Sequence, residues 1–244
     1  MQQSSNPVLS NKLVKKLARS VESTDHMTIE GSLSKTAFLL GIVIAVGGWS
    51  WNFVSNNLEQ AGSWVIGGTI TALIVALAII FWKPNPVLTV IYAAAQGIVL
   101  GAISLLFNAT AQGIVLQAVL LTIGVTLAML TLYATRLITV TQKLRSVILI
   151  ATVGVLFFYV LTFIIGIFSP AFTDAVYSGN LGIAIAAIIV IVAALNLLLD
   201  FDFIESGSEN KLPKQLEWYA AFGLMVTLIW LYLSILRLLG ASRS

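Results

Sequence analysis

From residue 181 to residue 201 the chain reads LGIAIAAIIVIVAALNLLLDF, an apolar run with one ionisable side chain, Asp200. A bilayer core about 30 Å thick is crossed by about 20 apolar residues in a helix. The run has that length, and it does not alternate between polar and apolar residues as the strands of a membrane β-barrel do. This stretch therefore predicts a helix that spans a membrane.

Six further stretches have the same character on either side of this one. Short polar or turn-forming segments separate them, such as Lys83-Pro84-Asn85-Pro86 and the segment from Glu205 to Gln215. We predict an all-α integral membrane protein, a seven-transmembrane-helix bundle within residues 36–240, between a cytosolic tail (1–35) and a short C-terminal tail (241–244). The seven predicted spans are 36–56, 64–82, 87–107, 114–134, 147–168, 181–201 and 217–238.

The composition agrees with this class and excludes others. Of 244 residues, 59% are hydrophobic and 9% charged, whereas soluble domains have about 25% charged residues. The absence of cysteine excludes disulfides, thiolate metal sites and cysteine nucleophiles. The net charge of +3 comes from residues that flank apolar runs, so we expect the lipid bilayer as partner and no nucleic acid.

The N-terminal tail has an amphipathic pattern. Apolar residues recur every four positions with cations between them, which is typical of a helix lying on an anionic leaflet. A frayed cytosolic tail is an equally good interpretation. The apolar positions are Leu9, Leu13, Leu17 and Val21, and the cations are Lys12, Lys15, Lys16 and Arg19.

The distribution of Lys and Arg predicts the orientation. The tail carries five Lys or Arg residues, and the first, third and fifth loops carry none. The second loop has Lys83, the fourth has Arg136, Lys143 and Arg145, and the sixth has Lys211 and Lys214. Positive residues favour the cytosolic side, so the N-terminus and the even loops are expected there. Seven spans then place the C-terminus outside, although it carries Arg237 and Arg243.

Few ionisable or amide groups lie near membrane depth, and those that do are candidates for function. Asp200 and Asp202 are separated by about 200° of helical rotation, so they leave the helix on opposite faces and are no paired-acid site. Asn196 shares a face with Asp200. These acids can simply end a helix at headgroup level, but the leucines before Asp200 favour a partly desolvated carboxylate that binds a cation or senses protons.

Two helices carry small or hydroxylic side chains at helical spacing, as helices that pack closely in a membrane do. Gln96 lies beside one of these stripes, where it either bonds between helices or lines a pore. The residues are Gly97 and Gly101 in the third span, and Gly223, Thr227, Trp230 and Ser234 in the last.

Signatures of soluble enzymes are missing. His26 is the only histidine, and the chain has no phosphate-binding loop, dinucleotide fingerprint or nucleophile elbow. We therefore expect no enzyme, no cofactor and no metal centre.

Over nearly its whole length the sequence resembles the bacterial branch of the Bax inhibitor-1 superfamily, the transmembrane Bax inhibitor motif proteins. The resemblance implies a seven-helix bundle with the last helix central, and a proton-sensitive calcium leak channel or a regulator of membrane calcium. The residues that carry it are Asn6-Pro-Val-Leu-Ser10, Met27-Thr-Ile-Glu-Gly31, Tyr92-Ala-Ala-Ala-Gln-Gly-Ile-Val-Leu-Gly-Ala-Ile-Ser104, the basic fourth loop and Leu233-Ser-Ile-Leu-Arg-Leu-Leu-Gly240.

The resemblance also implies a sensor, from which this sequence departs. Asp200 takes the place of the family's aspartate at the end of the sixth helix, but Thr227 stands where the seventh helix has a second aspartate. Gln96 stands where many members have a glutamate, and Lys83 is a candidate counter-ion. We expect a membrane cation leak, with Ca²⁺ as the ion, and weakened proton gating at Asp200. A non-conducting regulator that acts through protein partners and a small-solute transporter remain as alternatives.

Overall fold

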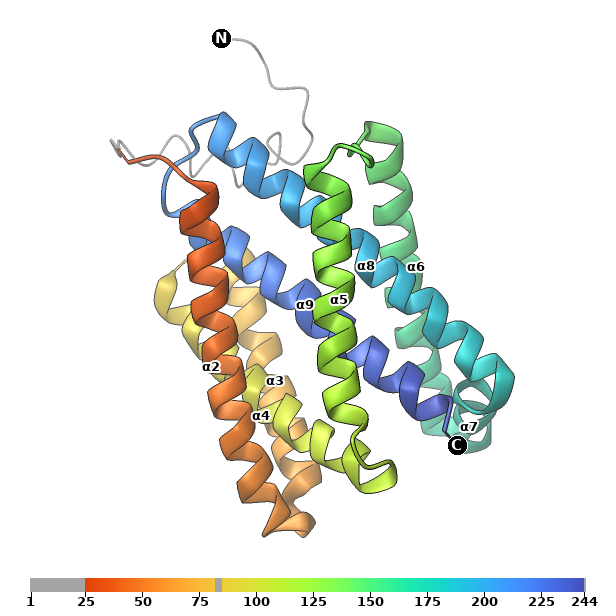
Figure 1. The fold of residues 1–244 in the computed structure, drawn as a ribbon. Helices are drawn as coiled ribbons and strands as arrows, with labels where there is room; N and C mark the ends of the chain where they lie inside the picture. Colours follow the sequence, from red (N-terminus) through yellow and green to blue (C-terminus); the bar gives the residue numbers. More distant parts are fainter. Residues whose placement is uncertain (1–24, 82–84, 244) are drawn as a thin grey trace. The chain divides into compact units, whose positions relative to one another are not determined.

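The structure, a computed structural model, describes residues 25–81 and 85–243. Within these ranges the chain is helical, and the only strand-like pairing is an isolated bridge between His26 and Pro213. The predicted amphipathic pattern between Leu9 and Val21 and the candidate Lys83 lie outside the described residues. The elements, drawn in Figure 1, are α2 (Ile29–Ser55), η1 (Leu58–Gln60), α3 (Ala61–Phe81), α4 (Pro86–Thr110), α5 (Ile114–Ala134), α6 (Gln142–Phe168), α7 (Pro170–Tyr177), α8 (Gly179–Glu209) and α9 (Leu216–Ala241).

Seven of these helices are long and apolar enough to cross a membrane, so the seven predicted spans are confirmed. The chain is a multi-pass integral membrane protein. In α4 and in α9, half of the most apolar 18-residue stretch of the helix is buried. The corresponding share is 11–22% in α2, α3, α5 and α6. The last helix is therefore among the most enclosed, as the predicted bundle requires.

Several helix ends differ from the predicted limits, because hydropathy marks the lipid crossing and not the end of the hydrogen-bonded helix. Helix α2 begins at Ile29 rather than residue 36, since the Thr28 hydroxyl caps it by accepting from the Gly31 amide at 3.0 Å. Thr141 caps α6 in the same way, so this helix begins before residue 147. Helix α8 continues past residue 201 to Glu209, so the loop predicted from Glu205 begins only after Glu209, and it ends at Gln215 as predicted.

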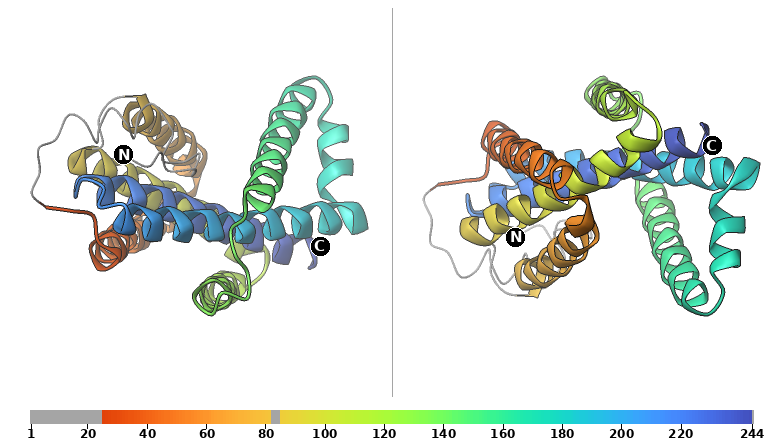
Figure 2. Two further views of the ribbon diagram at one scale, coloured as in Figure 1. Left: turned by 90° about the horizontal axis from the view of Figure 1, so that it is seen from above. Right: turned by 90° about the horizontal axis from the view of Figure 1, so that it is seen from below.

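The chain divides into two compact parts, which are described separately: residues 25–105 with 202–225, and residues 106–201 with 226–243. In the first part α4 lies between α2 and α3 (Figure 2). A Cβ atom on Gly101 would overlap the carbonyl oxygen of Gly47 on α2, and one on Gly97 would lie 2.9 Å from the carbonyl oxygen of Val43. The two glycines thus pack α4 closely against α2, which confirms the packing interpretation of this stripe.

The lead-in to α2 is tied to the segment before α9. The Met27 amide donates to the Leu212 carbonyl at 2.7 Å, and the Lys214 amide donates to the Asp25 carbonyl at 3.3 Å. The Lys214 ammonium also pairs with the Asp25 carboxylate at 3.1 Å. The hydrogen bond and the charge of Asp25 raise the pKa of Lys214 above its usual value. The two segments therefore meet in a short antiparallel pairing outside the apolar spans.

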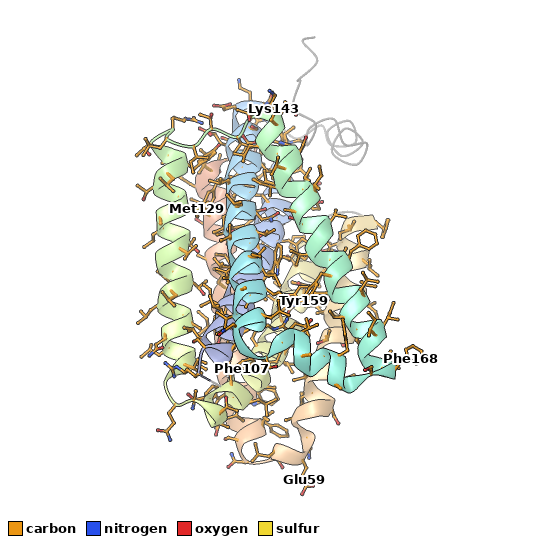
Figure 3. The ribbon with its side chains drawn as sticks, turned by 90° about the vertical axis from the view of Figure 1, so that its right-hand side faces the viewer. Glu59, Phe107, Met129, Lys143, Tyr159 and Phe168 are labelled. Carbon is orange, nitrogen blue, oxygen red and sulfur yellow. The ribbon has the colours of Figure 1, made fainter. Side chains whose placement is uncertain are left out.

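In the second part, α6 carries more exposed large apolar side chains than any other helix described there. Figure 3 shows its course from Lys143 near the first turn, past Tyr159, to Phe168 at the last residue. Val155 of α6 packs with Ile189 and Val192 of α8 in a buried cluster that Trp230 of α9 also contacts. The sequence did not predict α7, which occupies most of the fifth loop.

Candidate ion site on helices α8 and α9

Asp200 lies in the apolar helix α8 among buried side chains. It follows Leu197 and Leu198, which are both fully buried, and precedes the buried Phe201. Its Oδ2 atom is buried and makes no hydrogen bond to any of the described residues. A buried, incompletely bonded carboxylate oxygen is costly in an apolar environment and is a ready acceptor for a proton, a water molecule or a cation.

Thr227 of α9 provides the polar neighbour of this carboxylate. Its side chain hydrogen-bonds to Asp200, and the residue is 8% exposed. In the same stripe, the Ser234 hydroxyl donates to the carbonyl oxygen of Trp230 at 2.7 Å. Thr227 therefore contacts the carboxylate of Asp200 on α8, and Ser234 satisfies its hydroxyl within α9.

Asn196 extends the polar line by one helical turn. Its Nδ2 atom donates to the Thr152 hydroxyl of α6 and to the Val192 carbonyl, both at 2.8 Å. The Thr152 hydroxyl in turn donates to the Ile148 carbonyl at 2.8 Å. Asp200, Thr227, Asn196 and Thr152 therefore form a polar line that draws on three membrane-spanning helices.

The remaining candidates lie elsewhere. Asp202 and Glu205 are within α8 and not beyond its end. Gln96 donates from Nε2 to the Tyr92 hydroxyl at 2.9 Å within α4. The Tyr92 ring contacts the Phe222 ring edge-on, with 4.9 Å between the ring centroids. Gln96 thus has an intrahelical partner in the first part of the chain.

The ligand set at Asp200 suits a transient cation contact. Ca²⁺ takes six to eight oxygen ligands when it is held firmly. In the described parts of the chain no three His, Asp or Glu side chains gather as a metal-binding group. One carboxylate with a hydroxyl and an amide nearby offers an attractive point along a path rather than a storage site.

A fully enclosed carboxylate, that of Glu217 at the start of α9, was missed by the sequence interpretation. It is fully buried and accepts from the Thr28 amide at 2.9 Å, from the Thr28 hydroxyl at 3.0 Å and from the Lys35 ammonium. A Cβ atom on Gly31 would overlap its carboxylate. We call this group of Thr28, Gly31, Lys35 and Glu217 the clasp. A carboxylate at a helix N-terminus is favourable, and the signal in the sequence was an acid opening an apolar run.

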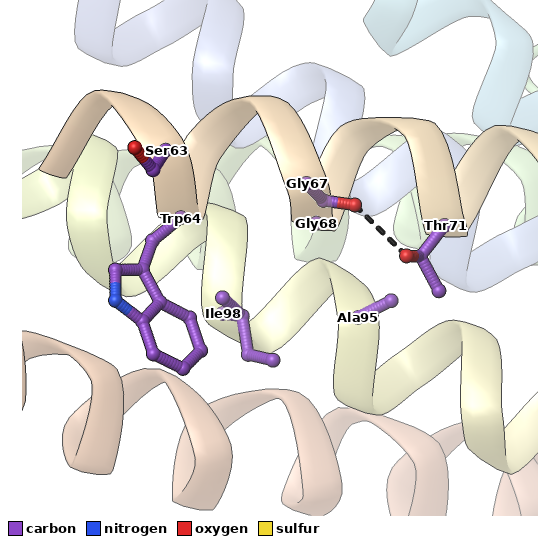
Figure 4. A pocket seen from close by; sticks show the side chains of 7 residues that line it. All are labelled: Ser63, Trp64, Gly67, Gly68, Thr71, Ala95 and Ile98. Carbon is purple, nitrogen blue, oxygen red and sulfur yellow. Dashed lines mark hydrogen bonds between the residues drawn. The ribbon is translucent and has the colours of Figure 1, made fainter. Parts of the chain in front are cut away.

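A shallow groove of about 320 Å³ lies between α3 and α4 (Figure 4). The Thr71 hydroxyl beside it donates to the Gly67 carbonyl at 2.8 Å. None of the lining side chains is ionisable, so the groove offers no charge to a cation. The lining residues are Ser63, Trp64, Gly67, Gly68, Thr71, Ala95 and Ile98.

Comparison with known proteins identifies the family. No curated protein matches the sequence. Residues 6–244, nearly the whole chain, match the protein family described as Bax inhibitor 1 like. With seven membrane-spanning helices and a match of this extent, the chain belongs to the Bax inhibitor 1 like family.

Proposed function

We propose that this protein is a membrane cation leak pathway, with Ca²⁺ as the expected ion, and that Asp200 is the carboxylate that controls it. The observation that carries the proposal is the buried Oδ2 atom of Asp200, which makes no hydrogen bond to the described residues. Ionisable groups inside membrane helices commonly mark ion paths or proton relays. Thr227 and Asn196 supply the polar neighbours that such a path needs.

The alternatives differ in what they require. A small-solute transporter typically has interrupted helices whose ends point at the substrate, whereas each of the seven described spans is one continuous helix. A non-conducting regulator requires no ion path. The purified chain in proteoliposomes, loaded with a Ca²⁺-sensitive dye, separates these functions. We expect Ca²⁺ entry above that of empty liposomes, and equal entry in both would favour the regulator.

We further propose that the protein lies in a bacterial inner membrane with its N-terminus and the α5–α6 loop in the cytosol, on the basis of the Lys and Arg distribution. The chain has no cysteine, so a single introduced cysteine is the only thiol that a reagent can label. Thr139→Cys in that loop should resist an impermeant thiol reagent added to intact cells. Gln112→Cys, in the preceding loop, should react. Labelling of Thr139→Cys from outside would reverse the orientation.

The pH dependence of the leak should be weak, because Asp200 faces Thr227 and not a second carboxylate. Two neighbouring carboxylates resist simultaneous ionisation and keep a shared proton to higher pH than one alone. We expect Thr227→Asp to make Ca²⁺ flux depend more steeply on pH and to move its transition to higher pH. Thr227→Ser keeps the hydroxyl and is the matched control. A steep transition near neutral pH in the unmodified protein, unchanged by Thr227→Asp, would contradict this prediction.

A further inference from the structure

The second part of the chain contains a larger cavity, at the end of α6 and against α7. Its volume is about 710 Å³, within the range of small-molecule pockets. Tyr159, Thr162 and Gly166 of α6 line one side, and Thr173 and Tyr177 of α7 line the other. The cavity is separate from the polar line at Asp200, because none of its lining residues belongs to that line.

The guanidinium of Arg237 on α9 lies over two of the lining rings. Its centre is 5.4 Å from the centroid of the Tyr159 ring and 5.1 Å from that of Tyr177. Stacking of this kind engages the face of the guanidinium and leaves its N–H donors in the plane free for an anion. Among the described side chains no carboxylate pairs with Arg237.

The lining also offers hydroxyl groups. The Thr162 and Tyr177 hydroxyls bond to each other at 3.0 Å. The Thr173 Oγ1 atom is buried and has no hydrogen-bond partner among the described residues. A Cβ atom on Gly166 would lie 2.6 Å from that oxygen, so the glycine is what allows Thr173 to turn inward. These groups are suited to a ligand with several oxygen atoms.

The other wall of the cavity is apolar and open to the membrane. Phe163 and Ile167 complete the lining and are 71% and 64% exposed. Both belong to a membrane-spanning helix, so their exposed surface faces acyl chains. Cavities that join a basic and aromatic end to an apolar wall match the two halves of a phospholipid, since tyrosine and arginine favour the headgroup layer.

We infer that this cavity binds an anionic phospholipid, with the phosphate on Arg237 and the hydroxyls and with an acyl chain along Phe163 and Ile167. This binding does not depend on ion conduction. It also gives a role to Arg237, which the proposed orientation places on the side of the membrane opposite the basic loops. A lipid phosphate would then neutralise the charge of Arg237.

The test measures lipid retention by native mass spectrometry of the full chain purified with equal amounts of phosphatidylglycerol and phosphatidylcholine. The unmodified protein should retain phosphatidylglycerol preferentially. Arg237→Gln should reduce that retention by about fivefold, the effect expected of one arginine next to an anionic headgroup. Arg243→Gln is the matched control, because this arginine lies just beyond the end of the same helix and donates to Gln117. It should leave retention unchanged.

Two further arms distinguish a bound phospholipid from a bound phosphate ion and from a general effect of the charge in the α7 sequence. Inorganic phosphate added to the lipid-bound protein should not displace phosphatidylglycerol, because it lacks the acyl chain. Asp174→Asn, which removes the acidic residue of the α7 sequence, should not lower retention. Equal loss in Arg237→Gln and Arg243→Gln, displacement by phosphate, lower retention in Asp174→Asn, or retention of both lipids alike would each overturn the inference.

Discussion

Asp200→Asn should lower Ca²⁺ flux through the reconstituted protein by at least about tenfold, which corresponds to the loss of about 1.4 kcal/mol of attraction for the ion. A unit charge near a cation contributes more than this in a partly desolvated site. Asparagine preserves the size of the side chain and can still bond to Thr227. The change therefore removes the charge and little else.

Asp202→Asn is the control for this measurement. It makes the same chemical change two residues away on the same helix, on the opposite face. We expect flux close to that of the unmodified protein. Both variants should be compared at matched protein incorporation, with dye-loaded liposomes and a Ca²⁺ gradient. If the two substitutions reduce flux equally, or neither does, Asp200 is not the controlling carboxylate.

The largest effect on stability is expected at the clasp. Glu217→Ala should lower the free energy of unfolding by about 3 kcal/mol, the low end for breaking a buried ion pair. The low end applies because the Lys35 side chain is 21% exposed and regains water when its partner is lost. The Thr28 amide and hydroxyl lose their acceptor as well. The measurement is reversible denaturation of the protein in detergent micelles.

Gly31→Ala should damage the same clasp from the other side. The added methyl would occupy the space of the Glu217 carboxylate and force it away from its three donors. Because both substitutions break one set of bonds, the double variant should be destabilised by less than the sum of the single effects. Gly41→Ala is the matched control on α2, since a Cβ there meets no atom within 4 Å. Additive losses, or an equal loss for Gly41→Ala, would show that the clasp is not the cause.

The sequence was sufficient to predict the membrane spans because a helix in lipid must be long and apolar whatever its tertiary contacts. The predicted span 114–134 agrees with α5 at both ends. The start of α2 and the end of α8 differ from the predicted limits by several residues. Both depend on hydrogen bonds that hydropathy does not measure, such as the cap at Thr28.

The sequence likewise predicted some residues of the candidate site and missed others. Asp200 stood out because it is an isolated acid after a run of leucines, and its Thr227 partner followed from aligning the last helix with the family. The bond from Asn196 to Thr152 joins residues 44 positions apart, and nothing in the local pattern of either helix predicts it. Glu217 was treated as the edge of a span, because its donors lie near the other end of the chain.

The clasp also has a consequence for biosynthesis. Thr28 and Glu217 are 189 positions apart, and a ribosome delivers α2 to the membrane long before it makes α9. Until then, the first turn of α2 and the Lys35 ammonium have no buried acceptor at this end. A contact between residues so far apart in the sequence forms late and closes a long loop. A chain that stops before residue 217 therefore differs from the finished protein at the start of α2 as well as at α9.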